Sequence, residues 1–207
     1  MSYTAAPTET LAGLTPAGNE SAEASEDGPL PDLVHRLSTV LSHERTSTGL
    51  LQTMLLTDLI TPEAVVPSLK VNTKKHALQE LSDRAGLISG LAAREIFDAL
   101  LQRERLGSTG IGEGIAIPHG KLAKAETIFG IFARLARPID FHSLDGAPVD
   151  LICLLIAPET AGADHLKALA RMARVLRDTR VTAKLRAARD VSALYAVLTG
   201  ETASHAA

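Results

Sequence analysis

The chain has 207 residues, a formal net charge of −3 at pH 7, and 45% hydrophobic and 22% charged residues. These values are ordinary for a globular protein with a substantial core, and the weakly acidic balance argues against a dedicated nucleic-acid binder. Aromatic residues make up only 3% of the chain, which excludes the aromatic stacking platforms that bind single-stranded nucleic acids.

The N-terminal segment, residues 1–53, has a different composition from the rest of the chain. Its first 30 residues are rich in Ala, Glu, Ser, Thr, Gly and Pro, which predicts disorder because few large apolar side chains are available for a core. An alternative is that Met54 is the functional start and residues 1–53 are a non-native extension, and the sequence leaves both readings open. No Lys or Arg precedes Arg36, and no apolar run is long enough for a signal peptide or a membrane span. We therefore expect a cytoplasmic protein without membrane insertion.

Residues 54–200 predict one compact α/β domain with a mixed central sheet flanked by helices, followed by a flexible tail at 201–207. The spacing of apolar residues, together with capping and stop signals, defines the expected elements. Strands are expected at 69–71, 114–117, 128–135 and 149–156. Helices are expected after a cap at Thr73 or Asn72, over 92–106 with Gly107 as a stop, over 165–177 with Asp164 as a cap, over 181–188, and over 191–198 with Asp190 as a cap.

The single cysteine, Cys153, lies within the apolar run from Val149 to Ile156. This position favours a small core residue over a nucleophile. A chain with one cysteine has no internal disulfide, which fits a reducing compartment.

The most informative segment runs from Gly107 to Lys121, with the sequence Gly-Ser-Thr-Gly-Ile-Gly-Glu-Gly-Ile-Ala-Ile-Pro-His-Gly-Lys. It is not a phosphate-binding P-loop, because Gly114 and Gly120 enclose five residues and Lys121 is followed by Leu. It is not a dinucleotide fingerprint either, because the glycines follow the pattern Gly-x-Gly-x-Gly after a predicted helix. The segment therefore needs another explanation.

His119 is the first candidate for chemistry. The Ile-Ala-Ile run before it predicts a short buried strand, and Pro118 is expected to stop that strand from pairing further. His119 would then be held open at a strand end, beside a glycine that cannot shield it. An imidazole in that position suits chemistry or ligation better than packing, because a lone pair is free near neutral pH.

Arg103 is the second candidate. It comes seven residues after Ile96, which returns a helix to nearly the same face and turns the guanidinium inward. Arginine is well suited to binding phosphate oxygens. The alternative is a structural salt bridge with Glu104 or Glu113.

Three further residues are weaker candidates. His165 would lie in the first turn of its helix, where free N–H groups favour an anion, although an exposed polar helix start is an equally good reading. Ser108 and Thr109 would either donate hydrogen bonds to a phosphate-sized pocket or simply shape a turn.

The pattern Gly-Ser-Thr-Gly-Ile-Gly…Ile-Pro-His-Gly-Lys-Leu resembles the active-site segment of the IIA proteins of the bacterial phosphoenolpyruvate-dependent phosphotransferase system. The fructose/mannitol/nitrogen superfamily fits best, and its nitrogen-regulatory branch is the most similar. The resemblance extends from about Leu55 to about Leu198. It implies that a small histidine phosphocarrier phosphorylates His119 at Nε2 while Nδ1 is held, and that Arg103 and His165 match the arginine and histidine beside the phosphorylated residue.

The resemblance implies a phosphorelay protein that regulates partner proteins through its phosphorylation state, rather than an enzyme of small-molecule turnover. A sugar-transport IIA protein that passes its phosphate to a IIB domain is the rival within the family. A metal-binding hydrolase built from His119, His165 and His142 is the rival from another class, although the sequence has no His-x₃-His or Cys pair. We expect no cofactor and no metal. The regulated targets, the active phosphorylation state and the oligomeric state are left open.

Overall fold

The computed structural model of the chain describes residues 55–204, with side chains described for residues 55–200. The helices and strands in chain order are α2 (Leu56–Leu59), a 3-10 helix (Pro62–Ala64), β1 (Val65–Leu69), α3 (Lys74–Ser89), α4 (Ala93–Arg105), β2 (Gly110–Gly112), β3 (Ile115–Ala116), β4 (His119–Leu122), β5 (Phe129–Ile139), β6 (Val149–Pro158), a 3-10 helix (Glu159–Ala161), α5 (Ala163–Leu176), α6 (Thr179–Ala187) and α7 (Val191–Ser204).

Six strands form one mixed sheet in the order β1-β5-β6-β3-β2, and β4 pairs with β6. The antiparallel pair β5–β6 lies at its centre. Strand β1 runs parallel to β5, β3 and β4 run parallel to β6, and β2 pairs antiparallel with β3. Strand β6 is buried along almost its whole length, which explains why its sequence is a continuous apolar run rather than an alternating one. The predicted class, a mixed sheet flanked by helices, is confirmed.

Strands β3 and β4 lie end to end along the same edge of β6. Ala116 is opposite Ile152 and His119 is opposite Leu155, so the register with β6 is the same on both sides of the gap at residues 117–118. The prediction that Pro118 stops the pairing was wrong beyond this gap. Proline lacks only the N–H donor, and its carbonyl oxygen still accepts a hydrogen bond of 3.0 Å from the backbone N–H of Leu155.

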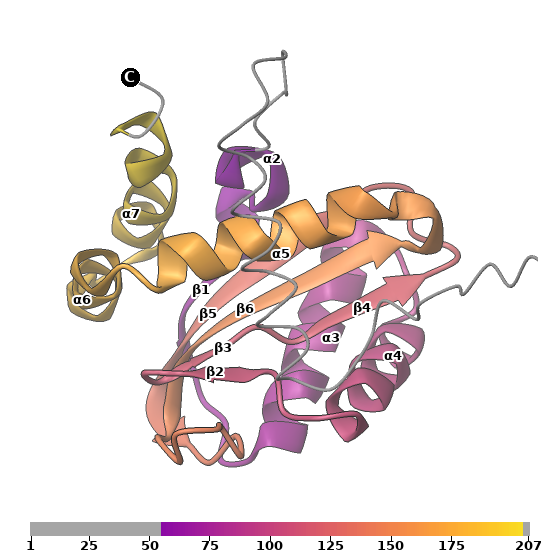
Figure 1. The fold of residues 1–207 in the computed structure, drawn as a ribbon, viewed down its shortest axis with the longest axis horizontal. Helices are drawn as coiled ribbons and strands as arrows, with labels where there is room; N and C mark the ends of the chain where they lie inside the picture. The colour runs from indigo at the N-terminus through magenta and orange to yellow at the C-terminus, as the bar shows by residue number, and fades with distance from the viewer. Residues whose placement is uncertain (1–54, 205–207) are drawn as a thin grey trace, which may run out of the picture.

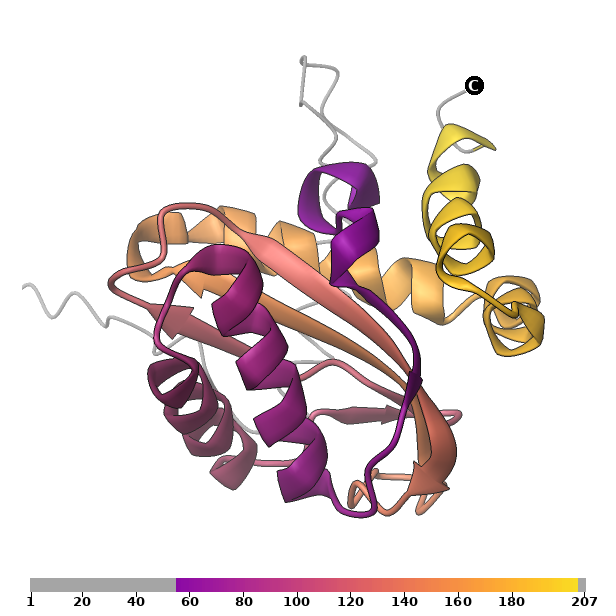
Figure 2. The same cartoon turned by 180° about the vertical axis from the view of Figure 1, so that it is seen from behind.

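Helices cover both faces of the sheet. Helices α3 and α4 lie side by side on one face, α5 crosses the other, and α6 and α7 lie together at one end (Figures 1 and 2). Helix α3 begins where the sequence predicted, because the hydroxyl of Thr73 accepts a hydrogen bond of 3.2 Å from the backbone N–H of His76. The predicted cap of α7 is also present, with a bond of 2.8 Å from the N–H of Ala193 to Asp190.

Several predicted boundaries were wrong. The first strand is Val65–Leu69 rather than 69–71, and it contains Pro67 because an edge strand tolerates a residue without a donor. Helix α5 is capped by Gly162, and Asp164 lies inside its first turn, where it accepts a hydrogen bond of 2.9 Å from Lys167. Helix α2 and strands β2 and β4 were not predicted, since they are too short for a periodic pattern.

Cys153 is fully buried in β6, where burial raises the pKa of its thiol to about 12. The prediction that it is a core residue is confirmed. Among residues 55–204, no helix combines the length and apolar character needed to cross a membrane. The predictions for residues 1–53 lie outside the described residues, and the proposed domain limits stay predictions.

Candidate functional site

His119 is the first residue of β4, and its side chain is 2% exposed. The prediction of an imidazole held open at a strand end was wrong, because β4 continues the ladder with β6 and α4 packs over it. Gly120 permits this packing, since a Cβ atom there would lie 3.3 Å from the Cβ of Ala99 in α4. The ring itself points to the opposite side of β4 from Gly120, where Arg103 and His165 lie beside it, and it is buried rather than standing in open water.

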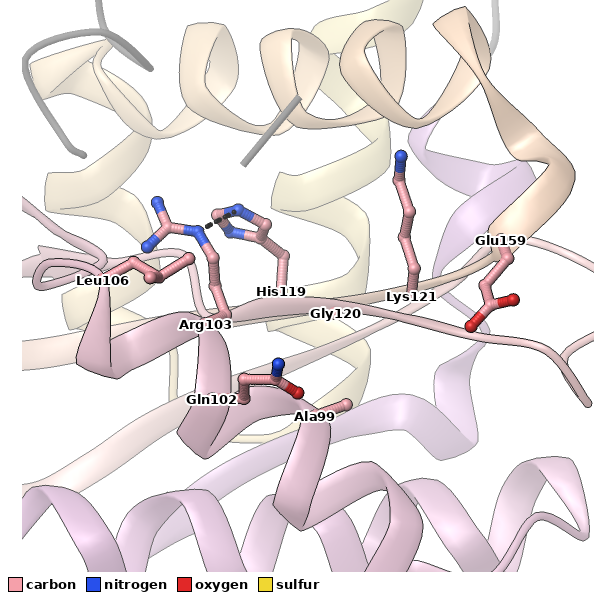
Figure 3. Close-up of a pocket in the computed structure, with 8 residues that line it drawn as sticks. All are labelled: Ala99, Gln102, Arg103, Leu106, His119, Gly120, Lys121 and Glu159. Atoms are coloured by element: carbon pink, nitrogen blue, oxygen red, sulfur yellow. Dashed lines mark hydrogen bonds between the residues drawn. The ribbon is translucent and has the colours of Figure 1, made fainter. Parts of the chain in front are cut away.

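Both ring nitrogens of His119 have hydrogen-bond partners. Nδ1 lies 2.8 Å from the carbonyl oxygen of Ile117, and Nε2 lies 3.0 Å from Nε of Arg103. A guanidinium N–H can only donate, so Nε2 is the accepting nitrogen and Nδ1 carries the hydrogen. Figure 3 shows the arginine and the imidazole facing each other. The arrangement selects one tautomer, with the lone pair on Nε2.

The surroundings keep this imidazole uncharged. Burial is the main cause that lowers the pKa of His119 to about 3, and the positive charge of Arg103 is the next. His165 and Lys121 act in the same direction, while the hydrogen bond to Ile117 opposes them. Near neutral pH the ring is therefore a neutral base with an available nitrogen lone pair.

Arg103 comes from the last turn of α4 and is 5% exposed. The prediction that it faces inward is confirmed. Its Nη1 donates a hydrogen bond of 3.1 Å to the carbonyl oxygen of Gly107, which directs Nε toward His119. The positive charge of the guanidinium thus lies directly at Nε2 of His119.

His165 approaches from the other side of the sheet, in the first turn of α5, and is 2% exposed. Its ring centroid lies 5.7 Å from that of His119, and the two rings are tilted by 57°. The structure therefore brings the three predicted residues, His119, Arg103 and His165, together from a strand and two helices.

A pocket of about 300 Å³ opens beside this group. It is lined by Ala99, Gln102, Arg103, Leu106, His119, Gly120, Lys121 and Glu159 (Figure 3). Lys121 extends from β4 on the same side as His119, as alternate residues of a strand do. The sequence reasoning missed Gln102 and Glu159 as pocket residues. Helical spacing could have indicated Gln102, since it lies three residues after Ala99 and four before Leu106 and shares a face of α4 with them. No local pattern indicated Glu159.

The structure does not bring the hydroxyls of Ser108 and Thr109 into this pocket. Ser108 Oγ donates to the carbonyl oxygen of Phe141 at 2.7 Å, and Thr109 Oγ1 donates to Glu104 at 2.6 Å. These contacts favour the reading in which both residues shape the turn.

The alternative metal site is not assembled in the described part of the chain. Across residues 55–204, no group of three or more His, Cys, Asp or Glu side chains is placed to hold a metal ion. His142 lies in the loop between β5 and β6 with a largely exposed side chain, 3.9 Å from Asp140.

Comparisons with known proteins identify the family of this chain. Residues 58–200 match the family described as "Phosphoenolpyruvate-dependent sugar phosphotransferase system, EIIA 2". The chain is 63% identical over 145 residues to the nitrogen regulatory protein of Bradyrhizobium diazoefficiens, a match that covers 70% of this chain and 95% of that protein. It is 38% identical over 149 residues to the nitrogen regulatory protein of Escherichia coli, covering 71% and 91%.

A solved structure is similar over a comparable share of the chain. The nitrogen regulatory protein IIA-Ntr from Neisseria meningitidis matches with a TM-score of 0.67 and 33% identity, covering 70% of this chain and 99% of that one. The family model, the curated relatives and the solved structure therefore point to the same family. The chain belongs to the EIIA 2 family of the phosphoenolpyruvate-dependent phosphotransferase system, within its nitrogen-regulatory branch.

Proposed function

We propose that the protein accepts a phosphoryl group on Nε2 of His119 from a small histidine phosphocarrier and regulates partner proteins through that phosphorylation state. The observation that carries the proposal is the bonding of the imidazole, with Nδ1–H on the carbonyl oxygen of Ile117 and the Nε2 lone pair facing Arg103 at the pocket. Family membership supports the same role.

The chemical step exchanges one P–N bond for another. The bond between phosphorus and the donor's imidazole breaks, the Nε2 lone pair of His119 forms the new bond, and the electron pair of the broken bond stays on the donor ring. The hydrogen on Nδ1 stays in its bond to Ile117, which stabilises the positive charge that develops on the ring. Arg103 must release Nε2 before the attack, and its guanidinium can then donate to the phosphoryl oxygens.

Regulation follows from the change in charge. A phosphoryl group adds about −1.5 to −2 charges to a hydroxyl side chain at neutral pH, and we expect a comparable change at the pocket here. Leu106, an exposed apolar side chain, lies on the rim of that pocket. A partner that packs on this rim would therefore meet a different surface in each state.

The first test is phosphorylation of the full chain by a phosphocarrier bearing labelled phosphohistidine. We expect an acid-labile label that is lost in His119→Ala and retained in His142→Ala, a matched control because His142 lies on an exposed loop. A label that survives in His119→Ala would contradict the proposal.

The sugar-transport role is the second candidate, because the family description names a sugar system. The two relatives compared above are both nitrogen regulatory proteins that match over nearly their whole lengths, which favours regulation. Rapid transfer of phosphate from His119 to an isolated IIB domain would favour transport instead. Retention of the phosphate would favour the regulator.

A further inference from the structure

Glu104 is a buried carboxylate that the phosphoryl-transfer step does not use. It follows Arg103 in the last turn of α4, and its side chain is 5% exposed. A buried charge is costly unless it is paired and hydrogen-bonded. Its environment therefore requires an explanation.

The carboxylate of Glu104 binds the turn that follows α4. The backbone N–H of Thr109 lies 3.1 Å from both carboxylate oxygens, and the Thr109 hydroxyl donates to Oε2 at 2.6 Å. Nζ of Lys74, the first residue of α3, supplies the compensating charge at 3.0 Å from Oε1. Lys74 also donates to the carbonyl oxygen of Phe141 at 3.1 Å, so the ion pair is itself held in place.

Thr109 passes this constraint to the reactive ring. Its carbonyl oxygen accepts a hydrogen bond of 2.9 Å from the N–H of Ile117, whose own carbonyl oxygen accepts the 2.8 Å bond from Nδ1 of His119. Residues 117–118 lie in the gap between β3 and β4 along β6, so the N–H of Ile117 is held by Thr109 and not by β6. A continuous hydrogen-bond chain therefore runs from Glu104 through Thr109 and Ile117 to Nδ1.

A second branch reaches the other ring nitrogen. The turn that Glu104 closes contains Gly107, whose carbonyl oxygen accepts the 3.1 Å hydrogen bond from Nη1 of Arg103. That bond directs Nε of the same guanidinium to Nε2 of His119. Both hydrogen bonds of the imidazole thus depend on the position of the 107–109 turn.

We propose that Glu104 is a positioning residue for phosphoryl transfer. By holding Thr109, its carboxylate fixes the carbonyl oxygen of Ile117 and the guanidinium of Arg103, and these two groups set the tautomer and the orientation of the His119 ring. Only the kinetic readout rests on the proposed function. The tautomer of His119 is a property of the resting protein and does not depend on any donor.

A merely structural role for Glu104 would predict something different. Loss of a structural contact would lower the free energy of unfolding and leave the imidazole of the folded molecules unchanged. A positioning role requires the ring itself to respond in molecules that remain folded. The state of the two ring nitrogens therefore separates the two roles.

The central experiment is long-range proton–nitrogen NMR of the full chain with nitrogen-15 in its histidines. In the parent protein we expect His119 to be wholly the Nδ1–H tautomer. In Glu104→Gln the weakened hold on Thr109 should admit the Nε2–H tautomer. Glu95→Gln is the matched control, because Glu95 lies on the same helix and pairs with Lys124 at 2.7 Å on the surface.

A second pair of variants examines the chain at Thr109. Thr109→Val removes the hydroxyl donor of the 2.6 Å bond with little change in volume, whereas Thr109→Ser keeps it. We expect Thr109→Val to populate the Nε2–H tautomer of His119, as Glu104→Gln does. Thr109→Ser should give the same spectrum as the parent protein. This pair also covers the case in which Glu104→Gln fails to fold.

The kinetic readout is the rate of phosphate uptake from a phosphocarrier, measured on folded protein. A misplaced nucleophile commonly costs up to about 100-fold in rate, and we expect roughly a tenfold loss or more in Glu104→Gln and Thr109→Val. Thr109→Ser and Glu95→Gln should keep the parent rate.

The outcomes separate this proposal from the proposed function. An unchanged tautomer in folded Glu104→Gln and Thr109→Val would overturn the positioning role, even if His119 is phosphorylated as expected. An altered tautomer in a protein whose His119 never accepts phosphate would support the positioning role and refute the phosphoryl-acceptor function.

Discussion

At the scale of single residues, His119 combines deep burial with a place in the lining of the pocket. Burial keeps the ring uncharged, and the hydrogen bond to Ile117 leaves the Nε2 lone pair facing Arg103 and the pocket. In the resting protein that lone pair is bonded to Arg103. Rotation of the arginine is therefore part of any reaction at Nε2, and the same charge that lowers the pKa of the ring becomes available to the incoming phosphoryl group.

The lowered pKa of His119 predicts an acid-dependent loss of stability. The pKa is about 3 in the folded protein, against an ordinary value of 6.5. As the pH falls from about 6.5 toward 3, the unfolded chain binds a proton that the folded protein does not, so the free energy of unfolding decreases; above this window His119 contributes no such dependence.

Chemical denaturation at pH 7 and pH 5 measures this effect. The parent protein should lose about 2 kcal/mol more between the two values than His119→Gln, because the substitution removes the proton-binding group from the unfolded chain. Equal losses in the two proteins would show that the folded ring is protonated near its ordinary pKa.

At the scale of elements, the site depends on how closely β4 approaches α4. A Cβ atom at Gly120 would meet Ala99, which lies one helical turn before Arg103. The glycine therefore sets the distance between the element that carries the imidazole and the element that carries the guanidinium. Glycine acts here through close approach rather than through an unusual backbone conformation.

Gly120→Val should separate these two elements. We expect a loss of about 1–3 kcal/mol in the free energy of unfolding, typical of overpacking, and slower phosphate uptake because Arg103 moves away from His119. Gly120→Ala should have a smaller effect, which Ala99→Gly should relieve. Gly200→Val is the control, because no neighbouring atom lies within 4 Å of a Cβ at that position.

At the scale of the whole molecule, α6 and α7 lie at the end of the sheet away from β4 and α4 (Figure 1). Arg134 of β5 holds the end of α6 by donating to carbonyl oxygens at 2.9 Å for Arg186 and 3.3 Å for Leu185, and it also donates to Ala188 just after that helix. Its Nε donates at 3.0 Å to the carbonyl oxygen of Pro67 in β1, the edge strand next to β5. This attachment concerns the stability of the domain rather than the site.

Arg134→Met should therefore lower the free energy of unfolding without changing the rate of phosphate uptake. We expect about 2 kcal/mol less free energy of unfolding, because several carbonyl oxygens lose a charged donor, and an unchanged rate of phosphate uptake. Arg137→Met, on the exposed part of the same strand, should change neither quantity. A large fall in the uptake rate of folded Arg134→Met would show that the two ends of the molecule are coupled.

Much of the fold was predictable because its determinants are local. Thr73 and Asp190 cap the helices as expected, the apolar run of β6 marks a buried strand, and the spacing of Ile96 and Arg103 placed the arginine inward. The errors occurred where a nonlocal contact overrides the local signal. Pro118 is followed by further pairing because β6 supplies a donor to its carbonyl oxygen.

By itself the sequence determined the family, the identity of the reactive histidine candidate and most helix limits, since motif spacing, caps and hydrophobic periodicity are properties of neighbouring residues. Only the tertiary structure decided how deeply His119 is buried, that Ser108 and Thr109 turn away from the pocket, and that Glu104 is linked to the imidazole through Thr109 and Ile117. These features depend on strand register and on the packing of α4 against β4. Both bring together residues that are far apart in the sequence, and local sequence patterns do not predict such contacts.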